Sequence, residues 1–158
     1  MIIIGELINS TRKAVKKAIE ERDAAYIQEL AKKQVAAGAH YLDVNAGAFV
    51  DDEEEHLLWL MDVVQKAANF PLALDSADPE MIEKGLQAHR AKEPPMINSI
   101  TAEEEKLNAI LPLIKKYNSK VIALCIDDNG MPSTSEERLV IVDNLCDRFT
   151  QAGIPLSD

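Results

Sequence analysis

The stretch Leu72-Ala73-Leu74-Asp75-Ser76-Ala77-Asp78-Pro79 indicates the fold class. Three apolar residues form a strand-like run that Asp75 closes, and Asp78-Pro79 then opens a helix with proline at a position that needs no N–H. Four other apolar runs show the same order of strand, polar residue and helix: Ile2–Ile8 with Glu6 and Asn9, Tyr41–Ala46 with Asp43 and Asn45, Met96–Ile100 with Asn98 and Ser99, and Val121–Asp127.

Strands that alternate with amphipathic helices predict a parallel sheet with helical crossovers. The fold class that we expect is α/β, a (β/α) barrel of the TIM type. Since eight βα units usually take roughly 250 residues, residues 1–158 would form one domain with five of them, an incomplete barrel. Its two edge strands would be unprotected, which predicts a homodimer or other self-association. An open flavodoxin-like sheet is disfavoured because Asn9-Ser10-Thr11, after the first strand, is not a glycine-rich phosphate turn.

The helices should have recognisable ends. The first helical region, 12–38, should break near Asp23 and end at Gly38, and a second helix should span about 52–68. Thr101-Ala102-Glu103-Glu104 predicts a capping box for a helix that reaches Tyr117 and that Pro112 bends or splits. The last helix should start at Ser133-Thr134-Ser135-Glu136 and end at Gly153. Its core-facing residues would be Leu139, Val142, Leu145, Cys146 and Phe149.

Composition excludes several classes of partner. The chain has 17 basic and 27 acidic residues, a net charge of −10, and few aromatic residues. Nucleic acid and anionic lipid are therefore not expected to bind, since both need basic patches. No apolar run approaches ~18 residues and no signal peptide is recognisable, so we expect a cytoplasmic protein with no membrane span. Cys125 and Cys146 are expected to be reduced core residues.

Asp75 is the strongest candidate for a ligand contact. A carboxylate at the end of a barrel strand can accept two N–H bonds from a ligand that carries an amino group beside a ring N–H. The alternative is a structural bond to the N-terminus of the following helix. Asp78 is better placed for that role.

Other polar residues at strand ends are weaker candidates. Asn98 offers a donor and an acceptor together, or it bridges neighbouring strands. Asp43 and Asn45 lie two residues apart and share one face of their strand, where one of them could simply support the other. Asp127 is followed by a predicted turn, Asp128–Gly130, and could still reach the site. The three histidines show no zinc-binding spacing, and no metal site is expected.

Four motifs together resemble the pterin-binding barrel of methyltetrahydrofolate:corrinoid methyltransferases, a family that includes the folate domain of cobalamin-dependent methionine synthase. They occur in order: Gly5-Glu6-Leu7-Ile8-Asn9, Leu42-Asp43-Val44-Asn45-Ala46-Gly47, Ala73-Leu74-Asp75-Ser76 and Met96-Ile97-Asn98-Ser99. Dihydropteroate synthase, a more distant relative, fits less well because its serine- and glycine-rich loop after the first strand is not recognisable.

The resemblance implies transfer of a methyl group from N5 of methyltetrahydrofolate to the cobalt of a corrinoid (cobalamin) carried by a partner protein. It implies that Asp75 and Asn98 hold the pterin edge and that Asn9, Asp43 and Asn45 line the same mouth. Ser99 and Asp127 complete the predicted pterin-binding set.

Two departures from the family pattern shape this expectation. Leu7 stands where many family members that serve a corrinoid iron–sulfur protein have arginine, which leaves room for a demethylase system acting on a methylated amine or ether. A further pterin-binding aspartate and an N5-assisting asparagine would follow Asp158, so this chain alone is expected to be inactive. Two alternatives stay open. One is a metal-assisted lyase with Mg²⁺ on Asp75, Asn98 and Asp127, and the other is a non-catalytic fragment that binds pterin or assists assembly.

Overall fold

Five parallel strands form one sheet in a computed structural model that describes residues 1–156. The strands are β1 (Ile4–Asn9), β2 (Tyr41–Asn45), β3 (Leu72–Asp75), β4 (Met96–Thr101) and β5 (Lys120–Leu124). They lie in the sequential order β1-β2-β3-β4-β5, and every pairing is parallel. Sequential order is that of a (β/α) barrel, and a flavodoxin-like sheet would place its strands differently. The predicted fold class is confirmed, with five βα units.

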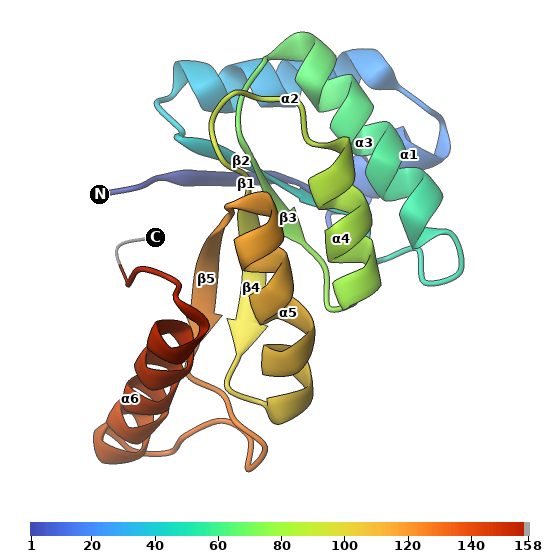
Figure 1. Ribbon diagram of the computed structural model, residues 1–158. Helices are drawn as coiled ribbons and strands as arrows, with labels where there is room; N and C mark the ends of the chain where they lie inside the picture. Colours follow the sequence, from blue (N-terminus) through green and yellow to red (C-terminus); the bar gives the residue numbers. More distant parts are fainter. Residues whose placement is uncertain (157–158) are drawn as a thin grey trace.

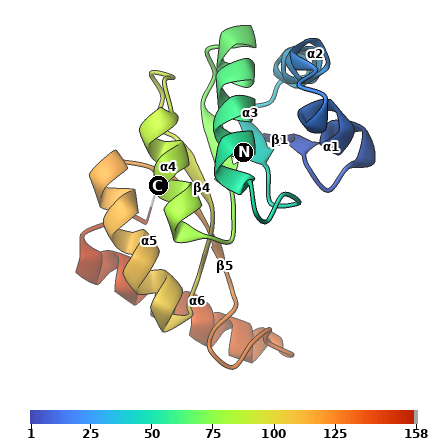
Figure 2. The same ribbon diagram turned by 90° about the vertical axis from the view of Figure 1, so that its right-hand side faces the viewer.

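Six helices follow the strands along the chain: α1 (Lys13–Glu20), α2 (Ala24–Ala36), α3 (Glu53–Ala67), α4 (Pro79–Ala88), α5 (Glu104–Tyr117) and α6 (Ser135–Ala152). Figures 1 and 2 show α1 to α5 in a row along one side of the sheet, with α6 beside β5 at the end of the row. One face of the sheet is thereby covered by helices. The opposite face corresponds to the interior of a barrel.

The two faces of the sheet carry different residues. Leu42 and Val44 of β2 are fully buried in the core between sheet and helices, together with Leu72, Leu74 and Ile97. Residues of the alternate positions form a second cluster on the inner face: Tyr41, Ala73 and Met96, with Ile4 and Ile122 packed against it. Because side chains alternate along a strand, Asp43 and Asn45 must share the inner face with Tyr41. The predicted common orientation of Asp43 and Asn45 is confirmed.

A bulge in β1 explains why a glycine occupies position 5. The register between β1 and β2 shifts between Gly5 and Ile8, and Gln34 of α2 uses its Oε1 to accept the Leu7 N–H at 2.8 Å. A Cβ on Gly5 would lie 2.6 Å from that oxygen. Gly5 thus leaves room for a buried glutamine that satisfies the irregular backbone of the bulge.

Several predicted helix ends are confirmed. The first helical region breaks at Asp23, whose carboxylate caps α2 through the Tyr26 N–H at 3.1 Å. Asp78 caps α4 by accepting the Glu80 N–H at 2.8 Å. Gly38 and Gly153 take positive φ values of 92° and 71° after α2 and α6, as glycines that terminate helices do.

Two local predictions are wrong, and one of the two outcomes predicted for Pro112 is excluded. The capping box at Thr101 does not form: α5 begins after Glu103, and the Thr101 Oγ1 donates to the Glu103 carboxylate at 2.6 Å. Of the two outcomes predicted for Pro112, a split does not occur, because α5 continues through this residue to Tyr117. Leu139 is 62% exposed.

The buried stripe of α6 accounts for the exposure of Leu139. Ile141, Leu145 and Phe149 recur every four residues and face the core, so Leu139 lies on another side of the helix. A capping box does form at the start of α6, between Thr134 and Glu137.

Two predicted strand limits also change. β1 begins at Ile4 instead of Ile2, and Ile2 and Ile3 are exposed. β5 ends at Leu124, three residues before Asp127, so Asp127 is not at a strand end. β1 and β5 form the two edges of the sheet in the part of the chain that the structure describes.

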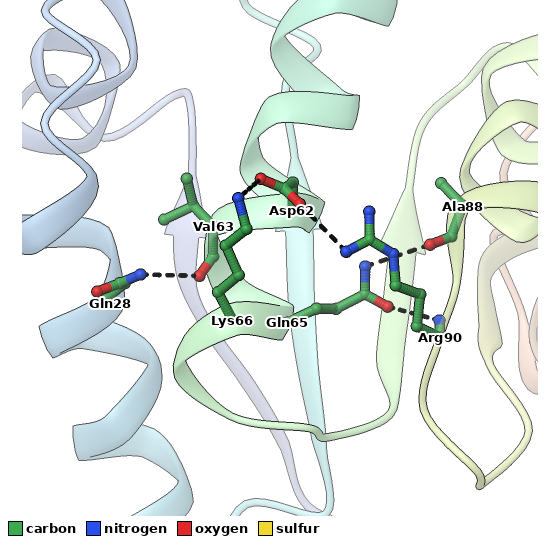
Figure 3. A network of polar contacts seen from close by, with 7 residues as sticks. All are labelled: Gln28, Asp62, Val63, Gln65, Lys66, Ala88 and Arg90. Atoms are coloured by element: carbon green, nitrogen blue, oxygen red, sulfur yellow. Dashed lines mark hydrogen bonds and ion pairs between the residues drawn. The ribbon is translucent and has the colours of Figure 1, made fainter.

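Polar contacts join the outer helices to each other and to the loop after α4 (Figure 3). Gln65 of α3 donates to the Ala88 carbonyl at 3.2 Å and accepts the Arg90 N–H at 2.6 Å. Asp62, one turn earlier, pairs with Lys66 and with Arg90. These contacts fix α3 against α4 on the side of the sheet away from the strand ends that carry the predicted site. Within residues 1–156, no helix combines the length and apolar character needed to cross a membrane.

Candidate functional site

Polar side chains gather where β2, β3 and β4 end. The three strands are parallel, so Asn45, Asp75 and Asn98 reach the same edge of the sheet, with Asp75 and Asn98 as direct register partners. All three are half-buried. This is the edge at which barrel enzymes bind their ligands.

Asp75 is held by the amide of Asn45. The Asn45 Nδ2 donates to the Asp75 Oδ2 at 2.9 Å and to the Asp75 carbonyl at 3.2 Å. Partial burial raises the pKa of Asp75 above its ordinary value, the bond from Asn45 opposes this rise, and the nearby charge of Glu6 adds to it. Within residues 1–156 the other carboxylate oxygen, Oδ1, accepts no hydrogen bond. Since Asp78 caps α4, Asp75 does not fill the alternative structural role.

The orientation of the Asn45 amide is fixed by a buried serine. The Asn45 Oδ1 accepts from the Ser10 Oγ at 2.9 Å and from the Gly47 N–H at 3.1 Å, so the Nδ2 must face Asp75. Ser10 is fully buried, and its Oγ also accepts the Ala48 N–H at 3.0 Å. Ser10 was not among the predicted site residues. Its place directly after the first strand was the available signal.

Asn98 has a buried carboxylate behind it. Its Nδ2 donates to the Asp43 Oδ1 at 3.0 Å, and Asp43 is only 1% exposed. Burial is the main cause that raises the pKa of Asp43 to about 7; the bond from Asn98 lowers this pKa, and the charges of Asp75 and Glu6 raise it. The peptide bond between Asn98 and Ser99 is cis.

A cavity of about 280 Å³ opens beside these residues. Asp75, Asn98 and Ser99 line it together with Ser76, Thr101 and Lys106. Its volume is near the lower end of the range for small-molecule sites, about 300 Å³ and upward. Lys106 also contacts the Ala77 carbonyl, so the loop after β3 and the start of α5 meet at the mouth of the cavity. Sequence reasoning missed Lys106, because nothing in its local pattern distinguishes it from other helix-surface lysines.

Asn9 and Asp127 are engaged in turns. Asn9 is the register partner of Asn45, and its Oδ1 accepts the N–H and the hydroxyl of Thr11 at 2.9 and 2.7 Å. Asp127 accepts the N–H and the side-chain amide of Asn129 at 2.9 and 3.3 Å. Asp127 lines a separate cavity beside Glu137 and Ile141 and does not line that of Asp75 and Asn98. The three residues of the magnesium alternative therefore do not share one cavity.

Residues 1–156 contain no group of three or more His, Cys, Asp or Glu side chains placed to hold a metal ion.

Comparison with known proteins identifies the family. The sequence pattern of the family described as "Pterin binding enzyme" matches residues 5–154. The chain belongs to the pterin-binding enzyme family. It is 41% identical over 141 residues to the methylcorrinoid:tetrahydrofolate methyltransferase of Eubacterium limosum, an alignment that covers 88% of this chain and 51% of that protein.

A second relative is more distant. Over 156 residues the chain is 25% identical to the methionine synthase of Mycobacterium tuberculosis, which covers 95% of this chain and 13% of that protein. As a pterin-binding family member, the chain thus spans about half the length of the first relative and a smaller part of the second.

Proposed function

We propose that this chain supplies the pterin-binding part of a methyltransferase that moves a methyl group between N5 of a tetrahydrofolate and the cobalt of a corrinoid on a partner protein. The observation that carries the proposal is the pair Asp75 and Asn98. Both residues line the cavity, and a neighbouring side chain fixes each of them. The Asp75 carboxylate accepts a hydrogen bond from Asn45, and the Asn98 amide donates one to Asp43.

The donor pattern of a pterin suits Asp75. The 2-amino group and N3–H of a pterin form two adjacent donors, and an ionised carboxylate can accept both. Oδ1 of Asp75 is open to the first donor, and Oδ2 retains acceptor capacity beyond its bond from Asn45. The amide of Asn98 lies next along the sheet edge, where it can pair with a ring N–H or carbonyl group.

Methyl transfer demands a change of protonation at N5. In the direction from folate to cobalt, N5 must be protonated, because an unprotonated N5 would have to leave as an amide anion, whereas a protonated N5 leaves as a neutral amine. In the reverse direction the N5 lone pair attacks the methyl carbon, the cobalt keeps the electron pair of the broken bond, and N5 then loses its proton. The same pterin site serves both directions, with the pterin held so that N5 faces the partner.

Two observations favour transfer toward tetrahydrofolate as the working direction. The name of the Eubacterium limosum relative places the methylcorrinoid as donor. Leu7, in place of the arginine found in many acetyl-CoA-pathway members, fits a demethylase system. We propose a cytoplasmic location, which the two free cysteines, Cys125 and Cys146, support.

Calorimetric titration of the 158-residue chain with methyltetrahydrofolate tests the pterin site. We expect Asp75→Asn to weaken binding by about 1.5–3 kcal/mol, because a half-buried charge-assisted acceptor is lost. Asp143→Asn, an equal change of charge on the exposed side of α6, is the matched control and should bind like the unmodified chain. Equal affinities for Asp75→Asn and the control would remove Asp75 from the site. Binding that requires Mg²⁺ would favour the lyase alternative.

A chimera tests the reaction itself. This chain would replace the matching half of the Eubacterium limosum protein, and methyl transfer from a methylated corrinoid protein to tetrahydrofolate would be followed by the cobalt absorbance. We expect the chimera to transfer methyl groups and its Asp75→Asn form to lose most of that activity. A folded chimera that binds pterin without transfer would support the non-catalytic alternative.

A further inference from the structure

Asp43 contacts Asn98 across an intervening strand. Asp43 lies on β2 and Asn98 on β4, yet the Asp43 Oδ1 and the Asn98 Nδ2 are 3.0 Å apart. The intervening strand is β3, where the register partner of Asp43 is Ala73, with a single methyl group as its side chain, and the register partner of Asn98 is Asp75. Asp43 is 1% exposed and does not line the ligand cavity.

We propose that Asp43 is a positioning residue: in its ionised form it fixes the amide of Asn98 so that Oδ1 faces the ligand, and in its protonated form it lets the amide turn over. The inference rests on the proposed function for the identity of the ligand. It differs from the role that the resemblance implied, in which Asp43 itself lines the mouth of the site.

The number of donors and acceptors on each group explains why the protonation state of Asp43 sets the orientation of the Asn98 amide. An ionised carboxylate can only accept, so it must face the Nδ2 of Asn98 and leave the Oδ1 as an acceptor for a ring N–H of the pterin. A protonated carboxyl group can donate to the Asn98 Oδ1 instead. The Asn98 amide then turns over, and its Nδ2 faces a ligand N–H. Two donors cannot form a hydrogen bond, so this orientation binds the ligand poorly.

The surroundings place this change near neutral pH. Glu6 on β1 and Asp75 on β3 are the charged groups that act on Asp43, both are acidic, and Asn98 on β4 is the one polar contact that opposes them. Together with burial they hold the pKa of Asp43 at about 7. If only the ionised form binds well, the affinity should fall by up to roughly tenfold for each pH unit below this pKa.

A double-mutant cycle separates positioning from direct contact. Methyltetrahydrofolate is titrated into the unmodified chain, Asp43→Leu, Asn98→Ala and the double variant at pH 8. We expect Asp43→Leu alone to lose roughly fivefold in affinity and to lose nothing further once Asn98 is alanine. If the loss of affinity in the double variant equals the product of the two single losses, Asp43 contacts the ligand itself and the inference is overturned.

The conservative variant Asp43→Asn adds a second measurement, the pH dependence of ligand affinity, which should not change if Asp43 has a purely structural role. Asp43→Asn keeps an acceptor beside Asn98 and removes the titration. It should recover part of the affinity lost in Asp43→Leu, and it should show no transition at the pKa of Asp43. Glu6→Gln should instead move this transition to lower pH, because removal of the negative charge favours ionisation of Asp43. Circular dichroism confirms that each variant is folded.

A ligand-free measurement distinguishes this inference from the proposed function. The side-chain amide resonance of Asn98 in a ¹⁵N-labelled chain should titrate together with the carboxyl carbon of Asp43, in the absence of any pterin. An amide resonance that is constant between pH 5 and 9 would overturn the positioning role. If the unmodified chain binds no methyltetrahydrofolate at any pH, the proposed function fails and the ligand part of this inference fails with it, whereas the amide titration would still report the coupling of Asp43 to Asn98.

Discussion

Asn45 Nδ2 lies 2.9 Å from Asp75 Oδ2, so the carboxylate best placed to hold a pterin is itself held by an amide from the neighbouring strand. The amide can face only one way, because Ser10 and Gly47 donate to its oxygen. A chain of hydrogen bonds therefore runs from the buried Ser10, directly after β1, through Asn45 of β2 to Asp75 at the ligand cavity. The site is organised before any ligand arrives.

Removal of the Asn45 amide should make pterin binding more sensitive to acid. The bond from Asn45 lowers the pKa of Asp75, so Asn45→Ala should raise that pKa further. Neutral Asp75 is a poorer acceptor than its ionised form. We therefore expect the loss of affinity for methyltetrahydrofolate, relative to the unmodified chain, to be larger at pH 6 than at pH 8. Calorimetry at the two pH values measures the difference. An equal loss at both would mean that Asn45 acts on the shape of the site alone.

The contribution of Asp43 to the stability of the chain should fall as the pH rises from about 4 to about 7. In this range Asp43 is already ionised in the unfolded chain, where its pKa is near the ordinary 3.8, whereas in the folded chain it keeps its proton up to about 7. The folded state then binds more protons than the unfolded state, so the free energy of unfolding decreases with pH. The size of the effect is about 3–4 kcal/mol across the range. Urea unfolding at a series of pH values measures it.

Asp43→Asn should abolish most of this slope and make the chain more stable than the unmodified protein at pH 8. Asp75 contributes a smaller slope of the same sign, which the variant retains. Asp143→Asn serves again as the control, with an unchanged slope. A variant that is less stable than the unmodified chain at pH 8 would contradict the ionisation cost assigned to Asp43.

Gly5 should be far less tolerant of substitution than Gly47. In Gly5→Ala the new methyl group would lie 2.6 Å from the Gln34 oxygen that accepts the Leu7 N–H, so the glutamine must move and the bulge loses its partner. We expect a loss of about 1–3 kcal/mol in the free energy of unfolding. A methyl group on Gly47 meets its nearest neighbours at an ordinary 3.7 Å, and Gly47→Ala should be near neutral. Equal effects in chemical denaturation would contradict the packing reason given for Gly5.

Exposed strand edges should make the 158-residue chain self-associate. β1 and β5 form the edges of the described sheet, and Leu124 of β5 is 39% exposed. An edge strand with unpaired backbone groups recruits another strand unless charged side chains protect it. Sedimentation velocity should show dimers or larger species that Leu124→Lys reduces. The control Leu139→Lys changes a leucine that is 62% exposed and belongs to the helix α6 instead of an edge strand. If that control disperses the chain instead, the helix surface and not the strand edge drives association.

The sequence was informative where structure depends on neighbours in the chain. The period of two in β2 predicted that Asp43 and Asn45 share a face, and Asp23 and Asp78 showed the helix starts that they cap. The core prediction for Leu139 is wrong, because an apolar residue near the start of a helix does not have to extend the buried stripe.

Contacts between residues that are far apart in the chain could not be predicted from the sequence. The link from Asp43 to Asn98 joins residues 55 positions apart, and the link from Ser10 to Asn45 joins residues 35 apart. Neither distance follows from periodicity, since both depend on strand order and register. Asp127 was predicted to lie at a strand end because it follows an apolar run. In the structure β5 ends three residues earlier, and the carboxylate of Asp127 accepts a hydrogen bond within a turn.

Ala73 gives the site a vulnerability that no polar residue reveals. On the inner face of β3, Ala73 presents only a methyl group beside Asp43, and Asp43 reaches across this strand to Asn98. A valine at position 73 would suit a β-strand and add apolar volume to the inner cluster, so the fold could persist through the change. The added methyl groups would nevertheless occupy the path of the Asp43 side chain. Sequence drift at this one apolar position could therefore produce members of the family that fold normally but have lost control over how Asn98 faces its ligand.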